Sequence, residues 1–387
     1  MSNKTNKLIP ELRFPEFIDT EPWKEETLQK VADYENGKAH EQDIDEKGKY
    51  VVVNSKFIST DGEVRKFSNT TNCIAKKNEI LMVLSDVPNG RAIAKCFYVD
   101  KDDFYTVNQR ICKITPTKVN STILFYTMNR NSYFLSFDDG VKQTNLKNDD
   151  VLNFPLILPV DPKEQEKIAS CLSSLDEVIT AHNQKLDTLK AHKKGLMQNL
   201  FPQEGKKVPN YRFTEFLKDG DWVEKSFKQL FDIGNGRDYK HLSNGKIPVY
   251  GSGGYMLSVD DFLYDGESVC IGRKGTIDKP MLLSGKFWTV DTLFYTHSFK
   301  DCTPKFIYYV FQNINWRKHN EAGGVPSLSK TNIYKIETKV PKPKEQQKIV
   351  DCLSSLDDLI TTEEEKIEQL KFHKKGLMQG LFPKIEN

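Results

Sequence analysis

The chain has 387 residues, of which 38% are hydrophobic and 28% are charged. Because one domain typically has about 150 residues, this length predicts two or three domains. The composition is typical of a folded globular protein and excludes collagen-like and disordered chains. The net charge of +2 comes from 56 basic and 54 acidic residues, a balance too even to indicate a nucleic-acid partner by itself.

No uncharged apolar run approaches the roughly 20 residues that a membrane-spanning helix requires. The first residues, MSNKTNK, lack the apolar stretch of a signal peptide. The seven cysteines are odd in number and include no C-x-x-C pair, which argues against a disulfide framework and against a zinc site. We therefore expect a cytoplasmic protein with reduced thiols and no metal site.

Residues 1–160 are expected to form the first domain. Strand-like runs occur at Tyr50–Asn54, Glu79–Leu84 and Ile111–Ile114, and a helical stretch lies near Ile123–Phe134. This mixture predicts a small α/β domain. Residues 1–161 contain 22 basic and 24 acidic side chains, so any DNA-binding face in this domain must be local.

Residues 161–202 are expected to form a long helix. Pro162 follows Asp161 and precedes Glu164, a typical helix start, and Phe201-Pro202 marks the end. Apolar residues recur at alternating steps of four and three over nearly five heptads, which predicts a coiled-coil seam. The seam residues of this helix are Ile168, Leu172, Leu175, Ile179, Leu186 and Leu189, continued by Leu196 and Leu200, with His182 and Lys193 at polar seam positions.

Residues 203–341 are expected to form the second domain, again of the α/β type. A strand-like run occurs at Ser268–Ile271 and a helical stretch at Pro304–Asn315. Residues 205–342 contain 21 basic and 15 acidic side chains, a difference of +6, whereas the corresponding difference for residues 1–161 is −2. The second domain is therefore the more basic of the two.

Residues 342–387 are expected to contain a second long helix that ends at Phe382-Pro383, because Pro343–Pro383 repeats Pro162–Pro202 at a constant offset of 181 with 27 identities in 41 positions. Lys342 replaces the capping aspartate, which weakens the start signal. The seam residues of this copy are Ile349, Leu353, Leu356, Ile360, Ile367 and Leu370, continued by Leu377 and Leu381, with Glu363 and Lys374 at the polar positions.

The starts of the two domains also repeat, at an offset of 199: Pro10, Arg13, Phe14, Glu16, Phe17, Trp23, Asn36 and Gly37 match Pro209, Arg212, Phe213, Glu215, Phe216, Trp222, Asn235 and Gly236. A helix of about 38 residues is about 57 Å long. The second domain connects the end of the first helix to the start of the second. It would have to bridge this whole length if the helices were parallel, whereas antiparallel helices place the two ends side by side. We expect an α+β protein in which two α/β domains alternate with two helices that pair as an antiparallel coiled coil, with an internal pseudo-twofold repeat.

Motifs for common enzyme chemistry are missing from the sequence. There is no G-x-x-x-x-G-K-[ST] phosphate loop, and there is no N-P-P-[FY] or D-P-P-Y run of the kind found in amino-methyltransferases. His192 and His373 recur within HKKGLMQ, where packing or a partner surface is the expected role. We therefore expect a protein that is not an enzyme.

The candidate functional residues are polar side chains in glycine-bounded loops of both domains. Arg, Lys, Asn and Gln pair with base edges, and Ser, Thr and backbone amides contact phosphates; the alternative is ordinary solvated loop charge. Asn89–Lys95 is matched to Arg273–Lys279, and Lys142–Asn145 to Val325–Ser327. The DNA-binding candidates are Asn89, Arg91, Lys95, Asn108, Gln109, Arg110, Lys142 and Gln143 in the first domain, and Arg237, Tyr250, Ser252, Arg273, Lys274, Thr276 and Lys279 in the second.

The sequence resembles the specificity (S) subunits of type I restriction-modification systems. The resemblance is carried by PKEQxKI at the start of each long helix, the LSSLD core, HKKGLMQxLFP at its end and RFxxF…W at the start of each domain. It implies two target-recognition domains, 1–160 and 203–341, which each read one half of a bipartite double-stranded DNA target. The helical spacers 161–202 and 342–387 are implied to hold two methyltransferase subunits and, indirectly, the restriction (motor) subunits.

The same resemblance implies that S-adenosylmethionine, ATP and Mg are bound by the partner subunits and that this chain carries no cofactor. Two other interpretations remain open from the sequence. The chain could be the DNA-recognition part of a fused methyltransferase-nuclease system whose catalysis lies on another chain. It could also be a purely structural coiled-coil adaptor, which salt-dependent binding to duplex DNA would exclude.

Overall fold

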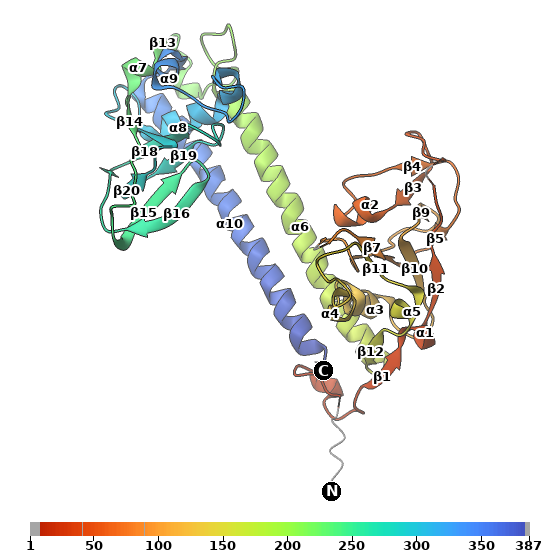
Figure 1. Cartoon of the computed structure of the whole chain (residues 1–387). Helices are drawn as coiled ribbons and strands as arrows, with labels where there is room; N and C mark the ends of the chain where they lie inside the picture. Colours follow the sequence, from red (N-terminus) through yellow and green to blue (C-terminus); the bar gives the residue numbers. More distant parts are fainter. Residues whose placement is uncertain (1–7, 41, 89, 384–387) are drawn as a thin grey trace. The chain divides into compact units, whose positions relative to one another are not determined.

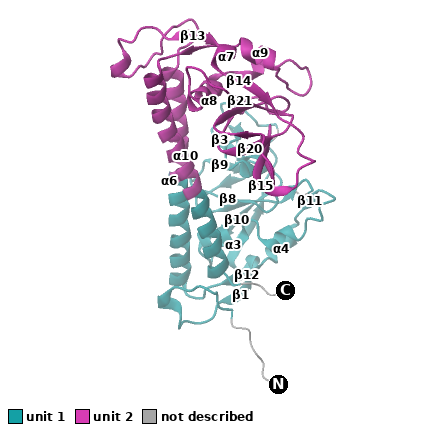
Figure 2. Cartoon of the chain, turned by 90° about the vertical axis from the view of Figure 1, so that its left-hand side faces the viewer, with its two compact units in different colours: residues 1–181, 367–387 teal, residues 182–366 magenta. Residues whose placement is uncertain are grey.

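The computed structural model describes residues 8–40, 42–88 and 90–383. The chain divides into two compact units, residues 1–181 with 367–387 and residues 182–366 (Figure 2). Each unit combines one variable domain with one half of each long helix. The first variable domain precedes the first long helix, and the second lies between the two long helices.

The two long helices are α6 (Pro162–Leu200) and α10 (Pro343–Leu381), each of 39 residues and continuous along its length (Figure 1). This confirms the helices predicted from the repeat. At the start of α6 the carboxylate of Asp161 accepts a hydrogen bond from the Lys163 amide at 2.8 Å. Lys342 offers the start of α10 only its backbone carbonyl, which agrees with the weaker start signal of the second copy.

The helices are antiparallel in both units. In the first unit the Lys374 ammonium of α10 lies 2.5 Å from the Asp176 carboxylate of α6. In the second unit Lys193 of α6 lies 2.6 Å from Asp357 of α10. The offset of 181 converts the first contact into the second with the helices exchanged, as the predicted pseudo-twofold repeat requires.

The predicted seam residues are covered to different degrees. Ile168, Leu172, Ile349, Leu353, Leu356 and Ile367 are buried, whereas Leu175, Ile179, Leu186, Leu189, Ile360 and Leu370 are half-buried. The buried residues near each helix start also belong to the core of a variable domain. Near each helix start, packing of a variable domain therefore contributes to the burial of the seam.

The first variable domain has two four-stranded sheets, in the orders β2-β10-β6-β8 and β4-β3-β9-β5, and two small strand pairs, β1-β12 and β7-β11. Among the described residues of this domain, only β3 and β9 pair in parallel. The elements are β1 (Lys24–Thr27), α1 (Leu28–Val31), β2 (Ala32–Asn36), β3 (Tyr50–Val53), α2 (Ser55–Ser59), β4 (Phe67–Ser68), β5 (Ile74–Ala75), β6 (Ile80–Val83), β7 (Ser85–Asp86), β8 (Cys96–Tyr98), β9 (Tyr105–Val107), β10 (Ile111–Pro116), α3 (Ser121–Met128), α4 (Ser132–Leu135), β11 (Thr144–Asn145), α5 (Asn148–Leu152) and β12 (Pro155–Leu158).

The second variable domain repeats this topology, with sheets β14-β21-β18-β19 and β16-β15-β20-β17 and the strand pair β13-β22. Its parallel pair is β15 with β20. The elements are β13 (Val223–Ser226), α7 (Phe227–Leu230), β14 (Asp232–Asn235), β15 (Asn244–Gly251), β16 (Gly254–Val259), β17 (Tyr264–Asp265), β18 (Ser268–Gly272), β19 (Met281–Leu283), β20 (Lys286–Thr289), β21 (Leu293–His297), α8 (Pro304–Asn313), α9 (Lys330–Lys335) and β22 (Glu337–Val340).

The helical stretch predicted near Ile123–Phe134 is interrupted in the structure. α3 ends at Met128, Arg130 adopts a left-handed backbone with φ of 56°, and α4 begins after Asn131, whose side chain caps the Tyr133 amide at 2.9 Å. The Asn129 side chain meanwhile accepts a hydrogen bond from the Cys96 amide. Side-chain capping by asparagine therefore breaks a stretch whose apolar pattern alone predicts one helix.

A buried ion pair joins the start of each variable domain to the start of a long helix. Arg13 donates two hydrogen bonds to the Glu164 carboxylate at 2.7 and 2.8 Å, and the Trp23 indole donates to the same carboxylate at 3.2 Å. Glu164 is 1% exposed. In the second unit, Arg212, Trp222 and Glu345 make the same three contacts. In each unit, the arginine and the tryptophan thus come from the repeat at the domain start, and the glutamate comes from the helix repeat.

Candidate nucleic-acid interface

Three loops of the second domain meet at the end of β18. The Arg273 amide donates to the Thr292 carbonyl at 2.8 Å, and the Gly275 amide donates to the Pro326 carbonyl at 2.9 Å. Lys274 forms an isolated strand bridge with Ser327. Arg273 and Lys274 are both exposed, so the backbone anchors this loop while the two cationic side chains remain available.

A cavity of about 330 Å³ lies beside this loop. Its lining includes Arg273, Lys274 and also Lys330, the first residue of α9. The Arg273 guanidinium and the Lys330 ammonium each lie 5.9 Å from the centre of the Phe294 ring. The Glu321 carboxylate also lines the cavity, but it accepts a hydrogen bond from the Ser329 amide at 2.8 Å.

The two cations on the Phe294 ring repel one another. Burial, and next the charge of Arg273, lower the pKa of the Lys330 ammonium. The ammonium donates to the Ile233 carbonyl at 2.7 Å, a neutral group. Two cations placed together in a partly desolvated cavity favour an anion, since an anion lowers the energy of both. Sequence reasoning missed Lys330, because it begins a short helix outside the glycine-bounded loops.

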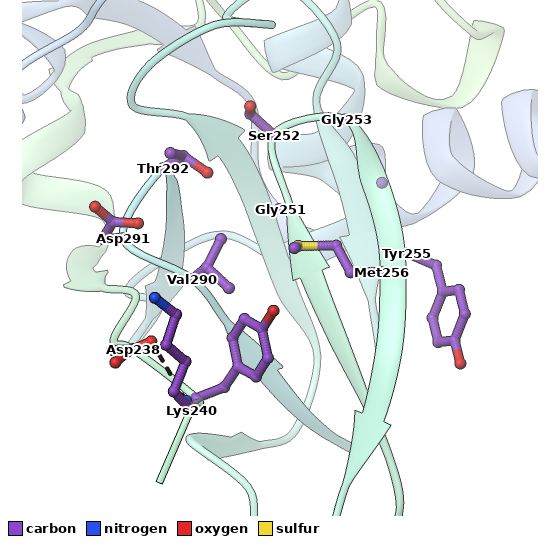
Figure 3. Close-up of a pocket in the computed structure, with 12 residues that line it drawn as sticks. Asp238, Lys240, Gly251, Ser252, Gly253, Tyr255, Met256, Val290, Asp291 and Thr292 are labelled. Carbon is purple, nitrogen blue, oxygen red and sulfur yellow. Dashed lines mark hydrogen bonds between the residues drawn. The ribbon is translucent and has the colours of Figure 1, made fainter. Parts of the chain in front are cut away.

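A second cavity, of about 670 Å³, opens beside the glycine-rich turn between β15 and β16 (Figure 3). Ser252, Lys240 and Thr292 line it, and Tyr255 points away from it. A Cβ on Gly275 would lie 3.2 Å from the Ser252 hydroxyl, so this turn lies against the Arg273 loop. The two cavities therefore lie next to each other in the second domain.

The other candidates of the second domain are more scattered. Arg237 is exposed, and its carbonyl accepts a hydrogen bond from the Trp288 indole at 2.8 Å. Tyr250 is half-buried, with its ring 6.2 Å from that of Tyr255. Thr276 is half-buried and Lys279 exposed. The structure brings Ser252 next to the turn that contains Arg273, Lys274 and Thr276.

The matching loop of the first domain has a different character. The Asp86 carboxylate accepts hydrogen bonds from the Ala92 and Ile93 amides at 2.7 and 3.1 Å, so it holds the loop closed. Arg91 is exposed, whereas Lys95 forms an ion pair with Asp61 at 2.7 Å within the domain. Asn89 lies outside the described residues.

The remaining candidates of the first domain lie on two loops. The side-chain amide of Gln143 donates to the Ser85 hydroxyl at 2.7 Å, and the neighbouring Lys142 is exposed. Gln109 and Arg110 are exposed on the other loop, where Arg110 has a left-handed backbone with φ of 68°. Asn108 is half-buried, and its side-chain oxygen is buried without a hydrogen-bond partner.

The loop correspondence drawn from the sequence is wrong in one respect. The Leu84 amide donates to the Arg110 carbonyl as Arg273 donates to Thr292, and Leu146 donates to Leu84 as Leu328 donates to Arg273. Arg273 therefore matches Leu84, not Asn89. Leu328 and Leu146 differ by 182, and by this offset Lys330 matches Asn148. The first domain consequently has neither cation of the Phe294 site.

The sequence matches the family model described as the type I restriction modification DNA specificity domain, over residues 20–191 and 219–371. It is 24% identical to the specificity subunit of the type I restriction enzyme MjaVIII of Methanocaldococcus jannaschii, covering 93% of this chain and 92% of that protein. The crystal structure of an S subunit from M. genitalium has a similar fold, with a TM-score of 0.69, 17% identity and coverage of 97% and 100% of the two chains.

A further structure with a similar fold, reported for complex assembly and conformational transition of a type I R-M system, has a TM-score of 0.54 and 14% identity over 93% of this chain and 97% of that one. In the described part of the chain, no helix combines the length and apolar character that crossing a membrane takes. The same residues contain no group of three or more His, Cys, Asp or Glu side chains placed to hold a metal ion.

Proposed function

The chain belongs to the family of type I restriction-modification DNA specificity subunits, and from this premise we propose that each variable domain reads one half of a bipartite DNA target. The two domains share a strand order but differ in their loops, which supports two different half-sites. Family membership and the near full-length likeness to a specificity subunit favour this function over the recognition part of a fused methyltransferase-nuclease.

The paired cations on Phe294 are the observation that carries the DNA contact of the second domain. Arg273 and Lys330 have the charge that a phosphate needs, and Arg273 can also pair with a guanine edge. In the first domain, by contrast, Leu84 and Asn148 occupy these positions. We assign the first half-site to the exposed polar loops that contain Arg91, Gln109 and Arg110.

The test of DNA recognition is binding to duplex DNA by the chain together with its methyltransferase partner, measured over a series of salt concentrations. Affinity should fall with increasing salt, since phosphate contacts release counterions. Mapping of methylated bases in cells that carry the complex should give one motif with two specific parts and a nonspecific spacer. A continuous motif, or no sequence preference, would contradict bipartite recognition.

The long helices are proposed to hold two methyltransferase subunits. Two grooves support this stoichiometry, because they use the same residues of the helix repeat. One groove, of about 1080 Å³ in the first unit, is lined by Lys371, Lys374, Lys375, Met378 and Phe382. The other, of about 580 Å³ in the second unit, is lined by Lys190, Lys193, Lys194, Met197 and Phe201.

The proposed occupant of each groove is a segment of the partner that combines acidic and apolar side chains. Lys374 and Lys193 pair with aspartates of the chain itself, so Lys375 and its counterpart Lys194 are the residues to test. Lys375→Glu and Lys194→Glu should each remove one methyltransferase subunit in native mass spectrometry. Lys335→Glu, on α9 outside both grooves, is the control. Full occupancy in both groove variants would contradict this docking site.

This chain is proposed to have no catalytic role of its own. S-adenosylmethionine, ATP and Mg would then act in the partner subunits. Methyl transfer should be absent from the purified chain with S-adenosylmethionine and should appear when the methyltransferase subunit is added. Methylation by the chain alone would overturn this part of the proposal.

A further inference from the structure

The helix ends that close the two units are nearly identical, with HKKGLMQNLFP in α6 and HKKGLMQGLFP in α10. In the first unit, Leu381 at the end of α10 and the next residue, Phe382, pack on the core of the domain. In the second unit, Leu200 at the end of α6 and the next residue, Phe201, do the same. The end of α6 from another copy of the chain therefore has the apolar side chains needed to replace the end of α10 in the first unit.

Synthesis of the chain creates an opportunity for this exchange. The first domain and α6 are complete at residue 200, whereas α10 ends only at residue 381. At about 5 to 20 residues per second, this interval lasts roughly 10 to 40 s. During that time, the nearest match for α10 is the α6 helix of a neighbouring incomplete copy.

One difference between the helix ends lies in direct contact with the first domain. Gly380 of α10 is buried, and its carbonyl accepts a hydrogen bond from the Leu12 amide at 2.8 Å. A Cβ at residue 380 would lie 2.5 Å from a terminal methyl group of Leu12 and 2.6 Å from its Cγ. Asn199, the α6 counterpart of Gly380, would therefore displace the Leu12 side chain.

The second unit accommodates the larger residue. The Asn199 carbonyl accepts a hydrogen bond from the Tyr211 amide at 2.9 Å, the equivalent of the Leu12 contact. Asn199 is exposed, and its side chain donates to the Gly195 carbonyl and accepts from the Asn210 side chain. Each domain thus fits the helix end that it contacts.

A second difference lies where the pseudo-twofold repeat brings equivalent positions together. His182 and Glu363 differ by the repeat offset of 181 and contact each other, and the Lys185 ammonium lies 2.8 Å from the same carboxylate. Glu363 is 4% exposed. Two α6 helices paired in this register would bring two imidazoles and two lysines together without a carboxylate.

We propose that Gly380 and the His182–Glu363 pair make the helix pairing selective, so that α6 accepts α10 and rejects the α6 helix of a second copy. The repeat preserves most of the apolar seam in either pairing, and these two positions are the buried differences between them; the surface pair of Lys190 with Glu364 at 2.6 Å would also be lost, because α6 has Asn183 at the Glu364 position. This selectivity keeps an incomplete chain available for its own second half. It is independent of DNA recognition.

The contact at the helix end is tested in the full-length chain by thermal unfolding. Gly380→Asn, which gives α10 the residue of α6, should lower the unfolding midpoint of the first unit by about 3 °C. The reciprocal variant Asn199→Gly also makes the two helix ends identical at this position, but it should leave the unfolding midpoint of the first unit nearly unchanged. Leu12→Ala should restore the midpoint of Gly380→Asn, because it removes the obstructing side chain. An unchanged midpoint in Gly380→Asn would overturn the proposal.

Selectivity itself is tested by coexpressing two full-length copies with different affinity tags. The wild-type copies should purify separately. The triple variant His182→Leu, Glu363→Leu and Asn199→Gly removes both differences on which the proposal rests, and it should increase copurification of the two tags several-fold. The variant with the two leucines alone retains the conflict between Asn199 and Leu12 and should copurify less. Copurification of the triple variant at the wild-type level would overturn the proposal.

Discussion

At the scale of single residues, the two cations of the second domain, Arg273 and Lys330, repel each other in the free protein and favour a bound anion. The Lys330 ammonium is held by the Ile233 carbonyl, and backbone hydrogen bonds to Thr292 and Leu328 anchor the loop from which the Arg273 guanidinium reaches the Phe294 ring. The mutual repulsion of the two cations is a cost to folding that an anion removes on binding. This arrangement is expected to increase affinity, because the cations need little reorganisation when a phosphate arrives.

Arg273→Ala should weaken specific binding by about 1 to 3 kcal/mol if the guanidinium reads a base, and it should relax recognition only in the second half-site. Lys330→Gln should instead weaken binding to all sequences similarly and reduce the salt dependence, because a phosphate contact carries no sequence information. Binding to a randomised target library at several salt concentrations separates the two effects. Unchanged affinity in Arg273→Ala would remove it from the interface.

The Glu363 carboxylate gives the stability of the second unit a defined pH dependence. Lys185 and then His182 lower the pKa of this carboxyl below its ordinary value of 4.5. A lowered pKa in the folded state stabilises the fold above pH 4.5, and the stabilisation is lost as the pH falls through the folded-state value. Wild type should therefore exceed Glu363→Gln in stability at pH 7, with a margin that shrinks below pH 4.5.

Denaturant unfolding between pH 3 and pH 7 measures this margin. Glu365→Gln is the matched control, because Glu365 is an exposed residue of the same helix and should show no such change. A margin that stays constant down to pH 3 would mean that the carboxylate charge does not contribute to the helix pairing.

Single residues were predictable to different extents. The cations of the Arg273 loop could be identified because glycines mark the turn on both sides. Lys330 could not, since its proximity to Arg273 depends on backbone bonds between segments about 55 residues apart, such as that from Leu328 to Arg273. The match of Asn89 with Arg273 failed because the closed loop around Asp86 obscures the alignment of the two domains.

At the scale of secondary structure, the buried Arg-Glu-Trp contact determines how each domain is attached to its helix. Glu345 receives two hydrogen bonds from Arg212 and one from Trp222, and it is 1% exposed. Breaking a buried ion pair leaves a desolvated charge without compensation, which typically costs about 3 to 5 kcal/mol. Attachment therefore depends on three residues that belong to the repeat and not to the variable loops.

Glu345→Gln should lower the free energy of unfolding of the second unit by about 3 to 5 kcal/mol. Glu215→Gln is the control, because Glu215 pairs with Lys348 at 3.3 Å on the surface and should have little effect. Hydrogen exchange in the full-length chain would locate the loss of protection in the second unit. Equal effects of the two variants would show that the buried contact is not the stabilising attachment.

The long helices were predictable in type and extent because the apolar pattern, the start signals and the repeat all indicate the same structure. The runs Tyr50–Asn54 and Ser268–Ile271 were also recognised, since buried strands have continuous apolar sequences. The order of the strands was not predictable. It depends on pairings such as β2 with β10, whose partners are far apart in the chain and are joined by polar loops that differ between the domains.

At the scale of the whole molecule, the repeat gives the two units equivalent contacts between α6 and α10. The contact between Asp176 and Lys374 in the first unit has its equivalent between Lys193 and Asp357 in the second. An α6–α6 pair would therefore preserve this ion pair, with Asp176 of one copy facing Lys193 of the other. The conflicts in such a pair are those at Asn199 and His182.

A fragment of residues 1–203 contains one recognition domain and α6. It therefore tests whether α6 can pair with a second α6 in place of α10. With Asn199→Gly and His182→Leu, two fragments should pair through the seam about a true twofold axis. Identical domains related by a twofold axis read inverted half-sites. Together with the methyltransferase partner, the substituted fragment should therefore methylate an interrupted palindrome built from the first half-site alone.

The unsubstituted fragment should dimerise more weakly, because each Asn199 would displace a Leu12 side chain and the two His182 side chains would lack their carboxylate. Analytical ultracentrifugation of both fragments measures the difference in dimerisation, and methylation mapping reports the palindrome. A substituted fragment that stays monomeric at high concentration and methylates no palindrome would contradict the view that the two helix repeats are interchangeable in pairing.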